Sequence, residues 1–346
     1  MITRARTPPR RGACPGLSAP MPTGDGLLTR FMPIGTIALA TFKRVCAAAQ
    51  TYGNGIVEVT ARGSIQIRGL SAASACEFAD EIATLEIAAQ DGVPILCNPL
   101  SGIDAEEILD VTPLALALRR TLAQRSAAAT LDAKVSVAID GGAKLNLARM
   151  PADIRLTAQS LNAETFLRVA LGGDDASALD LGPVAPEDGA EAAWRLLGLI
   201  AGRGHHTRAR DIIAADGAGL FREALSASPV LRWAPAAADA VQARPNRKER
   251  CHDAQVTQVI ALHRLRDGSL ARGIGLAFGH AEAGALERLA DAAATMGACG
   301  LRAAPERTLL VIGLTKQGAA DFVAVAEQLG FEIGRASCRE RVLRLV

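Results

Sequence analysis

Three arginines and one glutamine stand at spacings that could place them on one surface. They are Arg30, Arg62, Gln66 and Arg68, and the last three fall in residues 62–68, where polar residues alternate with isoleucines. Alternation with period two is typical of a strand with two different faces, so the polar residues would share one face. A guanidinium group is planar and meets both oxygens of a carboxylate. The pattern therefore indicates either a binding face for a ligand with several carboxylates or a solvated outer face.

The surrounding residues predict the elements that would position this face. Apolar residues at steps of three and four predict a helix between residues 39 and 49, and Ser74 with Glu77 has capping-box spacing at the start of a second helix. The expected order is a strand at residues 27–32, the first helix, strands at 56–60 and 62–68, and the second helix to Leu85. This β-α-β-β-α order is a ferredoxin-like half.

The same segment occurs twice in the chain. When the sequence is shifted by 244 positions, it matches itself without a gap, and Gly35, Gly53 and Gly69 fall on Gly279, Gly297 and Gly313. Ser71, which like Ser74 is a candidate cap of the second helix, falls on Thr315 in the same alignment. Because turns, caps and apolar positions coincide, we interpret the match as an internal duplication.

The two copies differ in their polar residues. Ile274, Glu306 and Ile312 stand where the first copy has Arg30, Arg62 and Arg68. The predicted arginine face is therefore a property of the first copy.

The composition limits the classes of protein to which the chain could belong. The chain has 346 residues, 49% of them hydrophobic, with a formal net charge of +2 and 3% aromatic residues. These values predict a globular protein and argue against nucleic acid as a partner. We expect no membrane span, because no apolar run approaches about 20 residues. The basic N-terminus lacks the apolar stretch of a secretory signal, so a cytoplasmic location is expected.

The cysteines and histidines predict no metal site. The seven cysteines are dispersed singly without a CxxC pair, so no zinc or iron–sulfur motif is present. Cys46 and Cys76 fall in the predicted helices and are expected to be core residues. His205 and His206 are adjacent, but no partner is spaced to complete a metal site, and a solvated turn is expected.

The predicted organisation has six parts. They are a basic leader (1–13), the first ferredoxin-like half (14–90), an α/β middle domain (91–235), a linker (236–262), the second half (263–333) and a tail (334–346). In the middle domain we expect a helix from 106 to 129 interrupted near Pro113. We also expect a strand that Lys134 opens, followed by a hairpin around Gly141 and Gly142.

Two segments carry a resemblance to a known family. RRGACPGLSAPMPTGDGLLTRF and EVTARGSIQIRGL resemble the opening of the precorrin-3B synthase family, which belongs to the nitrite and sulfite reductase superfamily. The T-x-R-x-x-x-Q pattern of Thr60, Arg62 and Gln66 is characteristic of that superfamily's first half. The resemblance implies an α+β fold, in which two ferredoxin-like half-domains flank a nitrite/sulfite reductase-like α/β domain.

The resemblance also implies a function in aerobic cobalamin biosynthesis. The expected substrates are precorrin-3A, a tetrapyrrole, and dioxygen, and the reaction hydroxylates C20 and closes a γ-lactone. Arg30, Arg62, Gln66, Arg68 and Lys134 are expected to bind tetrapyrrole carboxylates. Ser136 stands where the superfamily often has a second lysine. No general base and no iron ligand is assigned.

The cofactors of the family lead to a further expectation. The family uses a 4Fe–4S cluster and a non-haem iron, and its cluster domain carries four cysteines that have no counterpart here. Residues 334–346 are therefore expected to be a non-native tail after a truncation, and the chain as given is expected to be inactive. The alternatives are a sulfite or nitrite reductase relative with sirohaem and a non-catalytic tetrapyrrole-binding protein.

Overall fold

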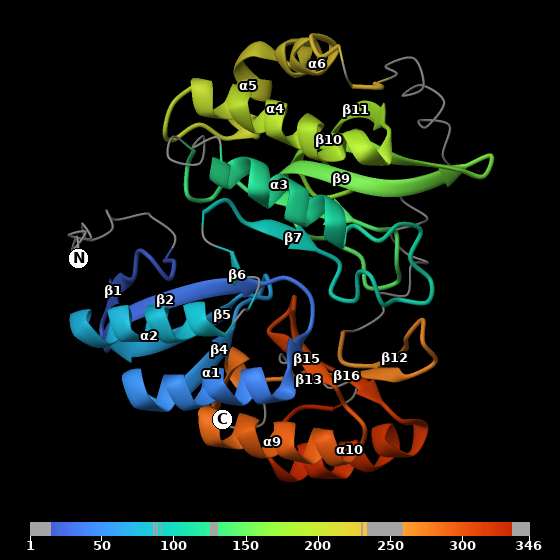
Figure 1. The fold of residues 1–346 in the computed structure, drawn as a ribbon. Coiled ribbons are helices and arrows are strands. Elements are labelled where there is room, and N and C mark those ends of the chain that lie inside the picture. Colours follow the sequence, from blue (N-terminus) through green and yellow to red (C-terminus); the bar gives the residue numbers. More distant parts are fainter. Residues whose placement is uncertain are drawn as a thin grey trace, which may run out of the picture. The chain divides into compact units, whose positions relative to one another are not determined.

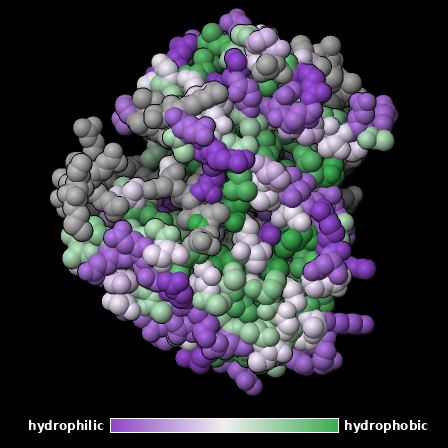
Figure 2. All heavy atoms as spheres, viewed as in Figure 1, coloured by the Kyte–Doolittle hydropathy of each residue, from purple (hydrophilic) through white to green (hydrophobic). Residues whose placement is uncertain are grey.

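The computed structural model describes residues 15–85, 87, 89–90, 92–124, 131–229, 231–233 and 259–333. The chain divides into two compact units, of which the first contains residues 1–91, 103–105 and 258–346 and the second contains 92–102 and 106–257. The predicted leader, the tail and residues 236–258 of the predicted linker lie outside the described residues. In the view of Figure 2, each unit shows a mixture of hydrophilic and hydrophobic surface residues.

The first half of unit 1 has the β-α-β-β-α order (blue in Figure 1). Its elements are β1 (Met21–Thr23), β2 (Gly26–Pro33), β3 (Ile37–Ala38), α1 (Leu39–Tyr52), β4 (Ile56–Val59), β5 (Ile65–Leu70), α2 (Ala72–Thr84) and β6 (Ala89–Gln90). The first sheet has the strand order β1-β2-β5-β4-β14, and β6 also pairs with β2.

The second half repeats this arrangement (orange and red in Figure 1). Its elements are β12 (Leu262–Arg264), β13 (Leu270–Gly275), η3 (Ala277–Gly279), β14 (His280–Glu282), α9 (Ala283–Thr295), β15 (Gly300–Ala304), β16 (Thr308–Leu314) and α10 (Lys316–Gln328). The second sheet has the order β12-β13-β16-β15-β3. The expected fold class, with two ferredoxin-like halves, is confirmed.

The two halves exchange one short strand each. β14 of the second half pairs with β4 in the first sheet, and β3 of the first half pairs with β15 in the second sheet. The shift of 244 positions superposes Ile37 and Ala38 on Ala281 and Glu282, so the exchange is reciprocal. Each half therefore completes the sheet of the other.

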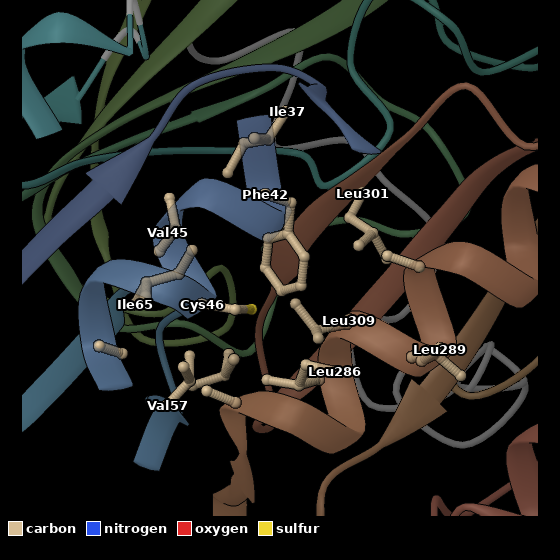
Figure 3. Packing of buried hydrophobic residues seen from close by; sticks show 14 of the residues in the cluster. Ile37, Phe42, Val45, Cys46, Val57, Ile65, Leu286, Leu289, Leu301 and Leu309 are labelled. Carbon is tan, nitrogen blue, oxygen red and sulfur yellow. The ribbon is translucent and has the colours of Figure 1, made fainter. Parts of the chain in front are cut away.

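One hydrophobic core joins the halves. Phe42 and Cys46 of α1 and Leu286 and Leu289 of α9 are fully buried in the same cluster, together with residues of both sheets (Figure 3). The predicted core position of Cys46 is confirmed. Cys76 on α2 is exposed, so its prediction was wrong. The apolar stripe of α2 is supplied by Ala75, Phe78, Ala79 and Ile82, and Cys76 lies outside that stripe.

The same local capping starts the last helix of each half. The Ser71 hydroxyl accepts a hydrogen bond from the backbone N–H of Ser74, and the Thr315 hydroxyl accepts one from Gly318. Both caps satisfy an N–H group that the first helical turn leaves without a partner. The alignment of the two caps follows from the duplicated sequence.

Unit 2 is a mixed sheet with helices. Its elements are β7 (Ile95–Cys97), α3 (Thr112–Gln124), β8 (Val137–Asp140), β9 (Ala152–Leu161), β10 (Glu164–Gly173), β11 (Leu179–Val184), η2 (Pro186–Asp188), α4 (Gly189–Gly202), α5 (Ala209–Asp216) and α6 (Gly219–Ser226). The strand order is β11-β10-β9-β8-β7, in which β7, β8 and β9 are parallel and β9, β10 and β11 are antiparallel.

Three predictions for the middle region were wrong. Lys134 lies in a turn, and β8 begins three residues later at Val137. No hairpin forms at Gly141 and Gly142, because β8 pairs in parallel with β7 and β9. Pro113 does not interrupt a helix, since it is the second residue of α3, where its missing N–H costs nothing.

None of the helices in the described ranges is long and apolar enough to cross a membrane.

Candidate functional site: a polar row across the first sheet

One row of polar residues crosses four strands of the first sheet. Arg30 on β2 pairs with Gln66 on β5, which pairs with Glu58 on β4. Glu58 in turn pairs with His280 on β14, the strand that the second half contributes. Side chains of directly opposed residues lie on the same face of a sheet. The row therefore joins residues from both copies of the duplicated segment.

Gln66 is the central hydrogen-bonding group of the row. Its Oε1 accepts hydrogen bonds from Nε of Arg30 at 3.1 Å and from Nη2 at 2.7 Å. Its Nε2 donates to Oε2 of Glu58. The side-chain amide of Gln66 therefore bridges the cation Arg30 on β2 and the anion Glu58 on β4.

Arg68 extends the network towards the β1–β2 turn. Its Nη1 lies 3.4 Å from Oε1 of Glu58, and its Nη2 lies 3.2 Å from Oδ1 of Asp25. Thr23 also donates a hydrogen bond of 2.8 Å to Asp25. The Thr23 hydroxyl, and then Arg68, hold the pKa of the Asp25 carboxyl below its ordinary value of 3.8. Asp25 is therefore ionised at neutral pH.

The other face of this sheet is apolar. Val57, Val59, Ile65 and Ile67 alternate with the polar residues and are buried in the core of unit 1. By contrast, the side chain of Arg68 is about one-third exposed, at 34%, and that of Asp25 is 41% exposed. Water therefore screens the ion pair between Arg68 and Asp25. A ligand carboxylate could replace Asp25 as the partner of Arg68.

Arg62 lies outside strand β5. It forms a bridge with Pro305, and the N–H of Glu306 donates to the carbonyl of Ala61 at 3.0 Å. The predicted strand from residue 62 was wrong because Gly63 has a φ of +79° and interrupts the alternation. The structure thus brings together Arg30, Gln66 and Arg68, and it places Arg62 at a turn against the second half.

Two acids belong to this site, although neither was among its predicted residues. Glu58 falls on the polar side of the predicted strand 56–60, so the alternation contained a signal for it. Asp25 lies in a turn, where no period fixes the direction of a side chain. The network contains two cations, Arg30 and Arg68, and two anions, Asp25 and Glu58, so its charges balance.

Lys134 belongs to unit 2. Its side chain is exposed, and its backbone N–H donates to Oδ1 of Asp132 at 2.8 Å. Ser136, two residues later, is fully buried, and its Oγ has no hydrogen-bond partner. A lysine at position 136 would have to bury its ammonium group, so a serine fits this site better.

The polar groups at the carboxyl ends of β7 and β8 form a closed cluster. Asn98 donates to Oδ1 of Asp140 at 2.9 Å and accepts from the N–H of Gly141 at 2.5 Å. Oδ2 of Asp140 accepts from the N–H of Leu147 at 2.6 Å. These hydrogen bonds stabilise the loops that follow β7 and β8. Across the described ranges, no group of three or more His, Cys, Asp or Glu side chains could hold a metal ion.

Comparison with known proteins agrees with this architecture. Residues 19–85, which carry the polar row of the first half, match the family model described as the nitrite/sulfite reductase ferredoxin-like half domain. The structure resembles the solved NirA protein of Mycobacterium tuberculosis with a TM-score of 0.71 and 18% identity. The match covers 90% of this chain and 58% of NirA, so the chain spans less than two thirds of that protein. The fold is that of the nitrite and sulfite reductase superfamily.

A closer relative defines the family. Over 335 residues, the chain is 36% identical to a precorrin-3B synthase of Sinorhizobium sp. The match covers 96% of this chain and 68% of that protein. The chain belongs to the precorrin-3B synthase family.

Proposed function

We propose that the chain acts in aerobic cobalamin biosynthesis as an oxygen-dependent oxidoreductase on precorrin-3A. The reaction inserts one oxygen atom of dioxygen as a hydroxyl at C20, and the acetate of ring A closes to a γ-lactone. The second oxygen atom leaves as water, with two electrons from an external reductant. The observation that carries the proposal is the 36% identity over 96% of the chain to a precorrin-3B synthase.

The polar row supports a tetrapyrrole as substrate. Precorrins carry several acetate and propionate groups, and we assign the carboxylate-binding role to Arg30, Arg62, Arg68 and Lys134, with Gln66 as a polar aid. Arg68 is the first candidate, because its contacts to Asp25 and Glu58 are at 3.2 and 3.4 Å and its side chain is partly exposed. Charge-assisted bonds to a substrate carboxylate would replace the screened contact to Asp25. The role of Lys134 rests on the family resemblance.

The iron groups of the family find no site in the described residues. A 4Fe–4S cluster needs four cysteine thiolates. Cys46, Cys76, Cys97 and Cys299 lie in separate elements, and no three potential ligands converge anywhere in the described ranges. We propose that cluster-dependent turnover needs ligands from outside the described residues.

The location is proposed from the thiols. Cys46, Cys76 and Cys299 are free thiols, which agrees with a reducing compartment. We propose that the protein is located in the cytoplasm.

Substitution of the arginines tests the substrate-binding role. Arg62→Ala and Arg68→Ala should each weaken tetrapyrrole binding by about 1 kcal/mol or more, the value of a lost charge-assisted contact. The measurement is a fluorescence titration with uroporphyrin, a stable tetrapyrrole with acetate and propionate groups. Lys43→Ala, which removes an exposed cation of α1, is the matched control. Equal affinity of all four proteins would reject the site.

Turnover separates the proposed reaction from the alternatives. Conversion of precorrin-3A in the presence of dioxygen supports the synthase. Reduction of sulfite or nitrite would instead support a reductase. Tight tetrapyrrole binding without either reaction, in a protein that contains its iron groups, would support a non-catalytic binding protein.

A further inference from the structure

Unusual backbone conformations gather in two turns of the second half. Five non-glycine residues of the described ranges have positive φ, and two of them, Asn162 and Ala163, form the tip of the β9–β10 hairpin. Glu306 and Arg307 lie in the same way at the tip of the β15–β16 hairpin, where positive φ is usual, and the fifth residue is Phe278. Such conformations cost free energy for residues with a Cβ and persist where the surroundings impose them, often at functional sites.

Phe278 is the most unusual of these residues. Its φ of 57° and ψ of 13° lie in the left-handed region, although the side chain is large. The side chain is also 72% exposed, so burial in the core does not offset the strain. Its ring stacks on the imidazole of His280, with centroids 6.4 Å apart and planes inclined by 25°. The turn therefore presents an ordered aromatic pair to the surface.

Arg307 lies beside the turn that carries this pair. A Cβ added at Gly279 would come within 2.7 Å of Cδ of Arg307 and within 3.1 Å of the carbonyl oxygen of Val59. The Arg307 side chain therefore passes over Gly279, between Phe278 and His280 in the chain. Arg307 is exposed, and it forms no ion pair with another described residue. Its guanidinium group remains available to an external anion.

The strand register connects these residues to the polar row. His280 is opposite Glu58, and Glu58 receives the hydrogen bond of Gln66. Phe278 lies in the turn before β14, and its ring stacks on His280, so it adjoins the end of this row. The second half thus extends the Arg30–Gln66–Glu58 row with an aromatic pair, and Arg307 lies next to the turn that carries this pair.

We propose that Phe278, His280 and Arg307 form a second part of the tetrapyrrole site, an inference that rests on the proposed function. Phe278 and His280 contact the face of the macrocycle, and Arg307 binds one of its carboxylates. Aromatic side chains stack on flat conjugated ligands, and a guanidinium group pairs with a carboxylate in its plane. The strained turn holds Phe278 in position before the ligand arrives, which reduces the ordering that binding requires.

The Phe278→Gly variant distinguishes a ligand-binding role of Phe278 from a purely structural one. Phe278→Gly removes the ring and also the backbone strain, because glycine adopts positive φ freely. We expect about ten-fold weaker binding of uroporphyrin, together with a thermal midpoint equal to or above that of the unmodified protein. A residue with only a structural role would lower the midpoint when replaced. Leu262→Ala, which truncates another exposed apolar side chain of unit 1, is the control and should change neither value.

A comparison of two porphyrins with different numbers of carboxylates tests the proposed role of Arg307. Uroporphyrin carries acetates as well as propionates, whereas coproporphyrin carries propionates only. Arg307→Gln should reduce the preference for uroporphyrin several-fold at constant ionic strength, because one charge-assisted contact is lost. Glu306→Gln, at the neighbouring position of the same turn, should leave this preference unchanged or increase it.

The outcomes distinguish the two levels of the proposal. If the unmodified protein does not bind uroporphyrin, the tetrapyrrole site and this inference both fail. If it binds, but Phe278→Gly and Arg307→Gln bind both porphyrins as it does, the proposed function stands and the present inference is rejected.

Discussion

Arg30 donates two hydrogen bonds to the side-chain oxygen of Gln66, at 3.1 and 2.7 Å, across neighbouring strands of the first sheet. This contact fixes which end of the Gln66 amide faces Glu58, to which Nε2 then donates. In the second half, Ile274 and Leu310 stand at the equivalent positions and are fully buried. Two positions of the polar row are therefore apolar in the second half, whereas Arg302, at the position of Glu58, donates a hydrogen bond of 2.8 Å to Thr36.

Replacement of Gln66 tests the central position of that row. Gln66→Leu introduces the residue of the second half and leaves groups of Arg30 and Glu58 without their partner. Because Gln66 is only 7% exposed, we expect a loss of about 1–3 kcal/mol in the free energy of unfolding. Urea denaturation measures it. Gln317→Leu removes an exposed hydrogen bond to Asp321 and should change the value by less than about 0.5 kcal/mol. Equal effects of the two variants would contradict the prediction.

The acid titration of Asp25 tests the β1–β2 turn. The pKa of Asp25 is lowered by the fold, so the folded state binds fewer protons than the unfolded state in this range. Its contribution to stability is complete above the ordinary value of 3.8 and is lost as the pH falls through the lower folded pKa. Thr23→Val should raise the pKa of Asp25 in an NMR titration. Asp267, whose pKa is lowered chiefly by Ser269, should not respond.

Asp153 is predicted to be essential to the stability of unit 2. Its side chain is 2% exposed and accepts hydrogen bonds from Arg208 at 2.9 and 2.7 Å and from the backbone N–H groups of Ser136 and Ala209. Asp153→Ala should lower the free energy of unfolding by about 3 kcal/mol or more, because these buried donors lose their acceptor. Arg203→Ala, which removes an exposed pair with Asp216, is the control for losing an ion pair. A similar small loss in both variants would refute the prediction.

Cysteine labelling tests the core that joins the two halves. Burial raises the pKa of the Cys46 thiol, so its reactive thiolate is scarce at neutral pH. In the native protein, iodoacetamide should modify the exposed Cys76 and Cys299 while Cys46 stays unmodified, as mass spectrometry of peptides would show. Denaturant should abolish the difference. Rapid native modification of Cys46 would mean that α1 and α9 do not pack as described.

The sequence by itself determined the duplication and the main helices and strands of each half. Ser71 and Thr315 cap equivalent helices because a cap depends on residues three positions apart. The alternation around Val57 and Ile65 determined the buried face for the same local reason. It also placed Glu58 on the polar face, although the sequence alone did not connect it with Arg68.

Only the tertiary structure decided which residues from distant segments meet. β14 joins the first sheet through backbone hydrogen bonds, which carry no side-chain code, so the pairing of His280 with Glu58 has no sequence signal. The exposure of Cys76 depends on how α2 is turned against its sheet, and the turn at Lys134 depends on where β8 meets β7 and β9. Local periodicity fixes the two faces of an element, whereas its neighbours are fixed by long-range packing and hydrogen bonding.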